Sequence, residues 1–247
     1  MNESSLRFAR HIALPEIGQA GQDRIGASTA LIIGLGGLGS PVATYLAGAG
    51  VGRLLLSDFD SVDLSNLHRQ TLYRTTDTGL QKTVAAAGQL HELNPHISLE
   101  TIDKRLSEAE LHEWVEQSDI VLDCSDNFGT RFAVNRACVA WKKPLVSGAS
   151  IRFEGHVSVF AGDAEDAPCY RCLYDESAET LEDCAGSGIL GPVVGVIGSL
   201  MAVEALKLLA EFGEPASGRM LIYDALAARW REVRISRDPA CPVCSGD

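Results

Sequence analysis

The sequence is poor in basic residues: 21 lysines and arginines face 33 acidic residues, which gives a formal net charge of −12. The few cations gather into no basic stripe, and this argues against free nucleic acid as a partner. The first 20 residues lack a long apolar core and carry Glu3, Arg7, Arg10 and Glu16, so the pattern of a secretory signal peptide is missing. We therefore expect a cytoplasmic protein whose thiols stay reduced.

Two stretches, 28–52 and 184–203, contain no charged residue. Both hold several glycines and a proline, and the first divides into a strand, a turn and a helix. Buried parallel strands and core helices also give unbroken apolar runs, so we do not expect either stretch to span a membrane. Repeats, low-complexity segments and linkers are absent from the 247 residues. The sequence predicts a single α/β domain over 1–247.

A glycine-rich turn follows the short apolar run 30–33. Its glycines fit the pattern G-x-G-x-x-G with one more between them: Gly34, Gly36, Gly37 and Gly39. Such glycines let the backbone approach a phosphate, and the helix that follows offers unpaired N–H groups. A second apolar run, 53–57, ends in two acids, Asp58 and Asp60. Asp58 lies 19 residues after Gly39, where an acid can hold a ribose hydroxyl.

This pattern alone fits any Rossmann-type enzyme, most often an NAD-dependent dehydrogenase. The string S-N-L-H-R-Q at 65–70 adds a cation and amides just past the acids, and Lys82 follows twelve residues after Gln70. A hydride-transfer enzyme has no evident need for these donors. A phosphate chain that must lose pyrophosphate does need them, because negative charge develops on the leaving group.

The remaining pattern predicts a sheet that begins parallel and continues antiparallel. Further strands are expected at 97–102, 120–123 and 144–150, and then at 152–162, 219–223 and 229–235. Helices are expected at 79–93, from a capping box at Ser107, at 127–141, and at 189–210 with Gly213 as its cap. An amphipathic N-terminal arm, 1–26, has its apolar positions at Leu6, Ile12, Leu14 and Ile17.

Two C-x-x-C pairs stand 68 residues apart, Cys169 with Cys172 and Cys241 with Cys244. Four thiolates are the natural tetrahedral set for zinc, and a site closed by four protein ligands is structural. Unrelated thiols or a redox pair are the alternatives, but a reducing compartment favours the metal. Strand 120–123 ends in D-C-S-D-N, which places acids at the crevice where parallel sheets bind ligands.

The motifs GLGGLG, DFDSVDLSNLHRQ, DCSDN and CPVC, in this order, resemble the MoeB/ThiF/HesA family, the bacterial relatives of ubiquitin-activating enzymes. The resemblance runs from Arg7 to Cys244. It implies that an adenylyltransferase with bound ATP and Mg²⁺ activates the C-terminal glycine of a small ubiquitin-like sulfur carrier and releases pyrophosphate. It also implies a homodimer, with 28–150 binding the nucleotide and 151–247 binding the carrier and zinc.

Carried over residue by residue, the family's ATP contacts fall on the glycines of the turn and on Asp58, Asp60, Asn66, Arg69, Gln70, Lys82, Asp126, Asn127 and Arg131. Asp126 would hold Mg²⁺, and Arg69 and Lys82 would neutralise the phosphates. Arg10 would reach the triphosphate from the partner subunit. The ordinary alternatives are a surface ion pair for Arg69 and a helix N-cap for Asp126.

Cys184 lies in an acidic, glycine-containing segment, where it is either a sulfur-transfer thiol or an ordinary exposed thiol. The neighbouring acids would raise its pKa, which counts against a self-activated nucleophile. Segments 147–160 and 167–173 resemble the molybdopterin branch of the family, whereas 183–198 fits the thiamin branch as well. With no rhodanese segment in the sequence, we expect the sulfur from a separate donor, a cysteine desulfurase or a rhodanese.

Three other functions compete with this interpretation. A dehydrogenase shares the glycine turn and Asp58 but leaves the paired C-x-x-C unexplained. A non-catalytic scaffold that binds the carrier would not need the arginine, the lysine and the magnesium acid. An enzyme that activates a tRNA base carboxylate is disfavoured by the net charge of −12.

Overall fold

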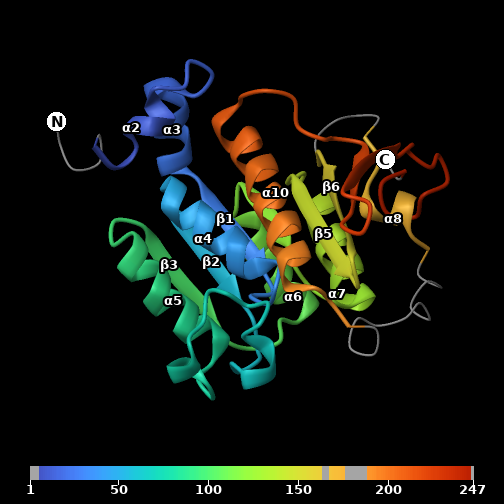
Figure 1. Ribbon diagram of the computed structural model, residues 1–247. Coiled ribbons are helices and arrows are strands. Elements are labelled where there is room, and N and C mark those ends of the chain that lie inside the picture. Colours follow the sequence, from blue (N-terminus) through green and yellow to red (C-terminus); the bar gives the residue numbers. More distant parts are fainter. Residues whose placement is uncertain (1–5, 163–166, 176–187, 246–247) are drawn as a thin grey trace.

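A computed structural model describes residues 6–162, 167–175 and 188–245 (Figure 1). Within these residues the strands form an eight-stranded sheet of order β3-β2-β1-β4-β5-β6-β7-β8. The strands from β3 to β5 pair in parallel, and β6, β7 and β8 continue the sheet antiparallel. The predicted change from parallel to antiparallel pairing is therefore confirmed.

The strands are β1 (Thr29–Ile33), β2 (Arg53–Ser57), β3 (Ser98–Ile102), β4 (Ile120–Asp123), β5 (Leu145–Ile151), β6 (Glu154–Phe160), β7 (Arg219–Asp224) and β8 (Arg229–Arg234). The helices are α2 (Ala9–Ile12), α3 (Gly18–Ala27), α4 (Gly39–Ala49), α5 (Lys82–Leu93), α6 (Glu108–Glu116), α7 (Phe128–Ala140), α8 (Tyr170–Leu173) and α10 (Gly191–Ala210). Two 3-10 turns, η1 (Leu64–Asn66) and η2 (Thr75–Asp77), lie between β2 and α5.

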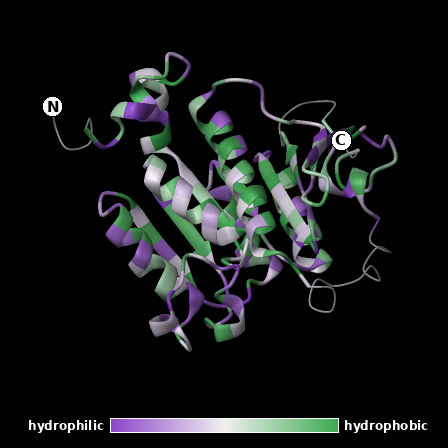
Figure 2. Ribbon diagram, in the orientation of Figure 1, coloured by the Kyte–Doolittle hydropathy of each residue, from purple (hydrophilic) through white to green (hydrophobic). Residues whose placement is uncertain are grey.

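Helices cover both faces of the sheet, and the alternation of side chains along β1 explains why. Ala30 and Ile32 enter the core formed with α4, α5 and α10, whereas Leu31 and Ile33 enter the core formed with α6 and α7. A strand buried on both faces must be apolar throughout, which is the pattern seen at 30–33. Figure 2 shows this apolar character in the central strands and in α10, with hydrophilic residues on the outer turns.

The order of the strands locates a ligand crevice. The chain leaves β1 for β2 and β3 on one side of the sheet, and β4 and β5 lie on the other side. The carboxyl ends of β1 and β4 therefore flank the point where the winding reverses, and open α/β sheets bind ligands at such a point. The glycine turn follows β1, and Asp123 ends β4.

Two predicted helices begin later than expected because their first residues pair elsewhere. Residues 79–81 bind the loop after β2: Gly79 N–H donates to Val62 O, and Gln81 forms a bridge with Ser61. Residues 188–190 bind the β5–β6 turn instead, where Arg152 N–H donates to Gly188 O. Such long-range pairing cannot be predicted from local helical composition.

Helix caps gave one confirmed prediction and one wrong one. Ser107 and Glu110 form the predicted capping box at the start of α6. The cap of α10 was expected at Gly213, but the chain turns into the left-handed region already at Glu211, with φ of 55°. Left-handed backbone at a non-glycine residue is costly, so nothing in the local sequence marks Glu211 as the cap.

The N-terminal arm is less buried than its predicted amphipathic pattern required. Ile17 is buried, but Leu6 and Leu14 keep 67% and 48% of their surface exposed. Helix α10 is long and apolar enough to span a membrane by length and composition alone, yet it packs against α4, β5 and β6. We therefore interpret α10 as a core helix.

Candidate functional site

At two positions of the glycine turn, another backbone segment lies so close that only glycine fits. Gly34 has φ of 88°, and a Cβ there would lie 2.9 Å from Cys124 O. At Gly39 a Cβ would lie 2.0 Å from Gly34 O. At Gly36 the nearest atom to such a Cβ is Gln70 Nε2, at 3.6 Å, so this glycine faces comparatively open space. The turn thus brings β1 and α4 together and leaves Gly36 accessible to a ligand.

Asp58 at the end of β2 is tied to this turn. Its carboxylate accepts hydrogen bonds from Leu35 N–H at 2.7 Å and from Asp60 N–H at 2.9 Å. Burial raises the pKa of Asp58, while the Lys82 ammonium, 3.8 Å away, and the two backbone donors oppose that rise. Each carboxylate oxygen keeps a further acceptor position, so Asp58 can still receive ribose hydroxyls.

Lys82, predicted in the first turn of the helix, is its first residue and is buried. Its ammonium lies 2.9 Å from Asp60, whose side chain is 56% exposed. The buried cation is therefore held beside two carboxylates at the mouth of the glycine turn. Incoming phosphate oxygens can compete with the exposed Asp60 for this lysine.

The S-N-L-H-R-Q string forms η1 and the turn after it, and Arg69 bonds to other members of the string. Arg69 donates to Asn66 Oδ1 at 2.8 Å and to Ser65 O at 3.2 Å. Gln70 is 4% exposed, and its Oε1 has no hydrogen-bond partner among the described residues. A buried amide oxygen without a partner indicates a missing donor, and its Nε2 faces the glycine turn.

The two acids after β4 have different environments. Asp123 is buried and accepts hydrogen bonds from the backbone and hydroxyl of Ser125, so it fixes the loop. Asp126 is exposed, and Asn127 rather than Asp126 caps α7 by accepting from Thr130 N–H at 2.9 Å. The carboxylate of Asp126 therefore remains available to a cation at the crevice.

Arg131 occupies a supporting position in the structure. It is buried, and its guanidinium donates to Ser125 O at 2.7 Å and to Gly148 O at 3.2 Å. The carboxylate of Asp123 raises its pKa against the opposing effect of burial. Arg131 thus holds the loop that carries Asp126.

Sequence reasoning missed two contributors to this region. Tyr73 is buried, and its hydroxyl donates a hydrogen bond to Leu35 O in the glycine turn at 2.8 Å. Arg105, after β3, stacks over the half-exposed ring of Phe59 with 4.3 Å to the ring centroid. Both contacts join residues that lie far apart in the sequence, so no local pattern marks them.

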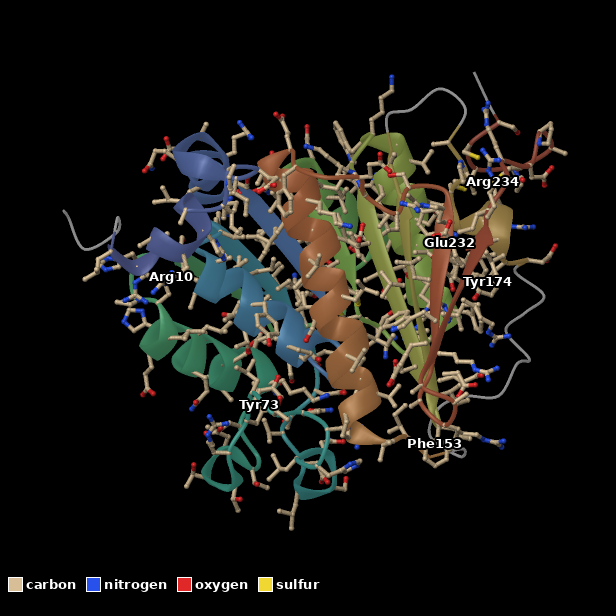
Figure 3. The ribbon with its side chains drawn as sticks, turned by 45° about the horizontal axis from the view of Figure 1, so that its top comes forward. Arg10, Tyr73, Phe153, Tyr174, Glu232 and Arg234 are labelled. Carbon is tan, nitrogen blue, oxygen red and sulfur yellow. The ribbon has the colours of Figure 1, made fainter. Side chains whose placement is uncertain are left out.

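Arg10 lies apart from Tyr73, whose hydroxyl contacts the glycine turn (Figure 3). Its neighbour Phe8 packs against Gly50, at the C-terminal end of α4, whereas the glycine turn lies at the N-terminal end of α4. A helix of 11 residues separates the two, about 16 Å. Arg10 therefore does not reach the nucleotide crevice of its own chain in this structure.

The four cysteines of the two C-x-x-C pairs come together, as predicted. All four Sγ atoms lie within 4.8 Å of one another, with contacts of 3.4 to 4.0 Å between neighbours. A tetrahedral zinc ion with Zn–S bonds of about 2.3 Å requires sulfurs roughly 3.8 Å apart. The cluster can therefore hold zinc, with Cys169 and Cys172 from the α8 segment and Cys241 and Cys244 from the tail.

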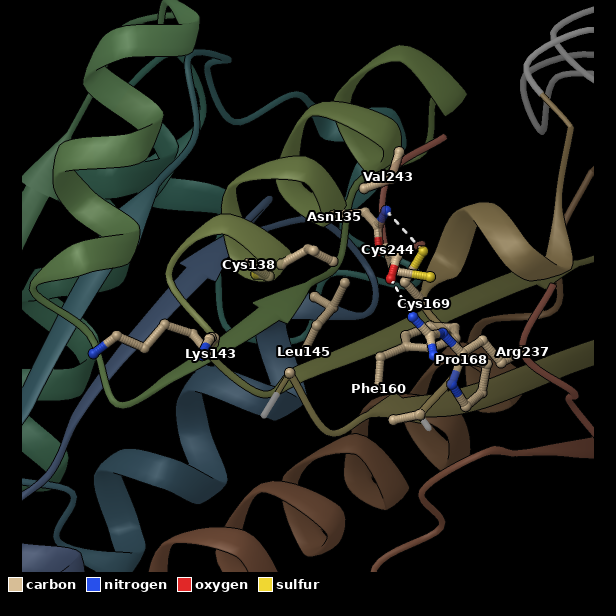
Figure 4. Close-up of a pocket in the computed structure, with 14 residues that line it drawn as sticks. Asn135, Cys138, Lys143, Leu145, Phe160, Pro168, Cys169, Arg237, Val243 and Cys244 are labelled. Carbon is tan, nitrogen blue, oxygen red and sulfur yellow. Dashed lines mark hydrogen bonds between the residues drawn. The ribbon is translucent and has the colours of Figure 1, made fainter. Parts of the chain in front are cut away.

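A cavity of about 470 Å³ lies beside this cluster, between α7 and the tail (Figure 4). Its walls include Leu145 at the start of β5, Phe160 at the end of β6, and Arg237. The cavity is therefore at the opposite end of β5 from the nucleotide crevice. The remaining predicted residue, Cys184, lies outside the described residues.

The model of the ThiF family matches residues 8–243. Molybdopterin-synthase adenylyltransferase of Escherichia coli is 45% identical over 98% of this chain and 97% of its own length. The sulfur carrier protein ThiS adenylyltransferase of the same organism is 44% identical over 98% and 95%. The SAMP-activating enzyme E1 of Haloferax volcanii is 43% identical over 96% and 88%.

A solved structure of Escherichia coli MccB with ATP superposes with a TM-score of 0.85 at 24% identity, covering 99% of this chain and 74% of that one. At this identity the likeness shows the fold alone. The relatives confirm the predicted adenylyltransferase over the dehydrogenase alternative. The chain belongs to the ThiF family of adenylyltransferases.

Proposed function

We propose that this protein adenylates the C-terminal glycine of a small ubiquitin-like sulfur carrier, as the names of its relatives indicate for them. The carrier carboxylate attacks the α-phosphorus of ATP, the bond from that phosphorus to the bridging oxygen breaks, and pyrophosphate leaves. The product is an acyl-adenylate that is open to sulfur. The observation that carries the proposal is that Gln70 faces Gly36 in the glycine turn, which also binds Asp58 beside Lys82, in a chain with these relatives.

The strand order gives the bound nucleotide a direction. The glycine turn and Asp126 follow β1 and β4, so the phosphates belong at this pair. Asp58 ends the next strand, β2, and would hold the ribose. The base then belongs at the outer side, between β2 and β3, where the stacked pair of Phe59 and Arg105 lies.

The side chains around the phosphates act by positioning and by neutralising charge. Asn66, Arg69, Gln70 and Lys82 would bind the phosphate oxygens, and the exposed Asp126, with Asn127 beside it, would hold Mg²⁺. One carboxylate suffices, because Mg²⁺ keeps several waters and takes its other ligands from the phosphates. Donors fixed before the reaction stabilise the charge that develops on pyrophosphate without reorganisation.

The active form in this proposal is a homodimer. Arg10 lies at the far end of α4 from its own crevice, so it can serve a triphosphate only in a second copy of the chain. A surface for that copy exists on the neighbouring helices α4 and α10, where Tyr45, Val196 and Val203 keep 56%, 38% and 45% of their surface exposed. Exposed apolar side chains on adjacent helices are typical of a protein interface.

Zinc would occupy the four-cysteine cluster as a structural ion in a cytoplasmic, reducing environment. Sulfur would come from a separate cysteine desulfurase or rhodanese, with Cys184 as the thiol that could take part. The carrier of molybdopterin synthase is the first choice of substrate. The thiamin carrier is the second, because the corresponding relatives are 45% and 44% identical.

ATP–pyrophosphate exchange, measured with each carrier separately, tests the proposal. Exchange that requires one carrier would establish adenylation and identify its pathway. In Asp126→Asn we expect exchange to be abolished, because the amide cannot replace the anionic ligand of Mg²⁺. Glu116→Gln makes the same chemical change at an exposed position on α6 and should leave exchange intact. Undiminished exchange in Asp126→Asn would refute the assigned role.

A further inference from the structure

Asn135 on α7 joins the nucleotide-binding half of the sheet to the cysteine cluster. The side chain is 1% exposed. Its Oδ1 accepts the Tyr170 backbone N–H at 2.8 Å. Its Nδ2 donates to Cys169 Sγ at 3.5 Å (Figure 4). A backbone N–H can only donate, so the contact with Tyr170 fixes the orientation of the amide. The NH₂ group must therefore face the sulfur.

A donor to a zinc-bound thiolate is a recognised kind of support. Four thiolates around one divalent ion leave two negative charges in excess, and hydrogen bonds to the sulfurs stabilise them. Asp238 N–H donates to Cys172 Sγ at 3.4 Å, and Arg237 donates to Cys244 O at 2.7 Å. Both of these residues belong to the tail that zinc itself would hold. Asn135 differs because it belongs to a helix of the parallel-sheet core.

The same helix carries the nucleotide loop at its other end. Asn127 caps α7 at Thr130 N–H, and Asp126 precedes it directly. From Asn127 to Asn135 the distance along a helix is about 12 Å, just over two turns. Between them Arg131 fastens the loop to Gly148 O. A helix of this length moves as a rigid body, so a constraint at Asn135 also acts on Asp126.

We propose that Asn135 is a positioning residue that supports the zinc-bound Cys169 thiolate and, through α7, fixes Asp126 in the nucleotide site. The zinc ion then has a second role besides closing the tail, because its presence sets how well Mg-ATP binds. The second part rests on the proposed function, since it takes Asp126 as the magnesium ligand.

The test compares Asn135→Asp with Val134→Ala in the full-length, zinc-loaded protein. The aspartate keeps the shape and the acceptor for Tyr170 N–H, but it loses the donor and sets a negative charge against the thiolate. Val134 is the buried neighbour of Asn135 on α7, so its truncation weakens the core without touching the cysteines. We measure zinc release to a chromogenic chelator. We then measure KM for Mg-ATP and kcat in ATP–pyrophosphate exchange, once without added zinc and once with saturating zinc.

For Asn135→Asp we expect zinc affinity to be about 10- to 100-fold lower than in wild type, the usual effect of losing such a partner, and zinc release to be correspondingly faster. KM for Mg-ATP should rise several-fold and return when zinc is saturating, while Val134→Ala shows neither response. Zinc release equal to wild type would overturn the role at Cys169. Faster release with an unchanged KM would overturn the coupling to Asp126. If Asn135→Asp does not fold, Asn135→Ser serves instead, since its hydroxyl cannot satisfy both contacts.

The two proposals fail in distinguishable ways. Wild-type protein without exchange activity would refute the proposed function, whereas zinc release needs neither carrier nor nucleotide. The comparison of the Asn135 and Val134 variants therefore remains decisive for the contact with Cys169.

Discussion

At the scale of single residues, the glycine turn separates positions that the fold needs from those that the ligand needs. Gly39 faces Gly34 O, whereas Gly36 faces open space and the end of Gln70. The pattern G-x-G-x-x-G in the sequence does not distinguish them. The distances show that Gly39 is required for close backbone packing, whereas Gly36 leaves space for a ligand.

Alanine substitutions at Gly39 and Gly36 should therefore have different effects, the first on stability and the second on ATP binding. In Gly39→Ala the new methyl collides with the backbone, and we expect the free energy of unfolding to fall by about 1–3 kcal/mol. In Gly36→Ala it should change by less than about 0.5 kcal/mol, while KM for ATP rises because the methyl occupies the phosphate approach. Urea denaturation and exchange kinetics check both values. A fully stable Gly39→Ala would contradict the close approach seen here.

His156 on β6 makes stability depend on pH. Its Nε2 lies 3.4 Å from the Tyr174 hydroxyl, and burial, together with the Arg131 charge, lowers the pKa of His156 to about 4. An unfolded histidine titrates near 6.5. Between these values the unfolded chain binds the proton and the folded chain does not, so stability is lost as pH falls from about 6.5 to about 4.

The full loss from this one histidine is on the order of 3 kcal/mol. We expect His156→Gln, which cannot be protonated, to show a smaller loss of unfolding free energy between pH 7 and pH 4.5 than wild type. Urea denaturation at the two pH values measures the difference. Equal losses in both proteins would show that folding does not lower the pKa of His156.

At the scale of elements, the cysteine cluster holds the C-terminal tail in place where no helix or strand does so. After β8 ends at Arg234, the tail to residue 245 contains no helix or strand, and it returns to α8 through Cys241 and Cys244. A metal site of this kind stabilises the folded chain by its binding free energy, because the unfolded chain lacks the preformed site. The tail should therefore depend on zinc more than any other described segment does.

Cys241→Ser should release that tail. Loss of zinc binding worth about 3 kcal/mol, the stabilisation when free zinc is roughly 100-fold above its Kd, would lower Tm by roughly 6–12 °C in a domain of this size. Cys138→Ala removes a buried thiol that is not part of the cluster, and it should keep its zinc. Zinc content by elemental analysis, calorimetry and limited proteolysis of the tail make the comparison. A Cys241→Ser protein with unchanged Tm would mean that the metal is dispensable for the fold.

The sequence was sufficient for those parts whose cause is local. Apolar runs such as 30–33 predicted buried strands, the capping box at Ser107 predicted the start of α6, and cysteine spacing predicted the cluster. Contacts between distant segments could not be foreseen: the stacking of Arg105 on Phe59, and the pairing that delays α5 to Lys82. Such contacts depend on which loops the sheet order brings together.

At the scale of the whole molecule, one protomer is an incomplete version of the proposed enzyme. The crevice residues converge at one end of α4, and Arg10 lies at the other end. The arm that carries Arg10 also leaves Leu6 and Leu14 exposed, which costs hydrophobic stabilisation unless another surface covers them. A dimer that joins the exposed faces of α4 and α10 would resolve both features.

Mixing two inactive variants tests this arrangement. Arg10→Ala lacks the arginine and Asp126→Asn lacks the magnesium ligand, so each homodimer should be inactive. In a refolded equal mixture about half of the dimers are mixed, and one of the two sites in each combines an intact Asp126 with Arg10 from the partner. Exchange should therefore recover to about a quarter of the wild-type rate. Because Arg10 acting within its own chain would leave every site defective, an inactive mixture of well-folded dimers would exclude the contribution in trans.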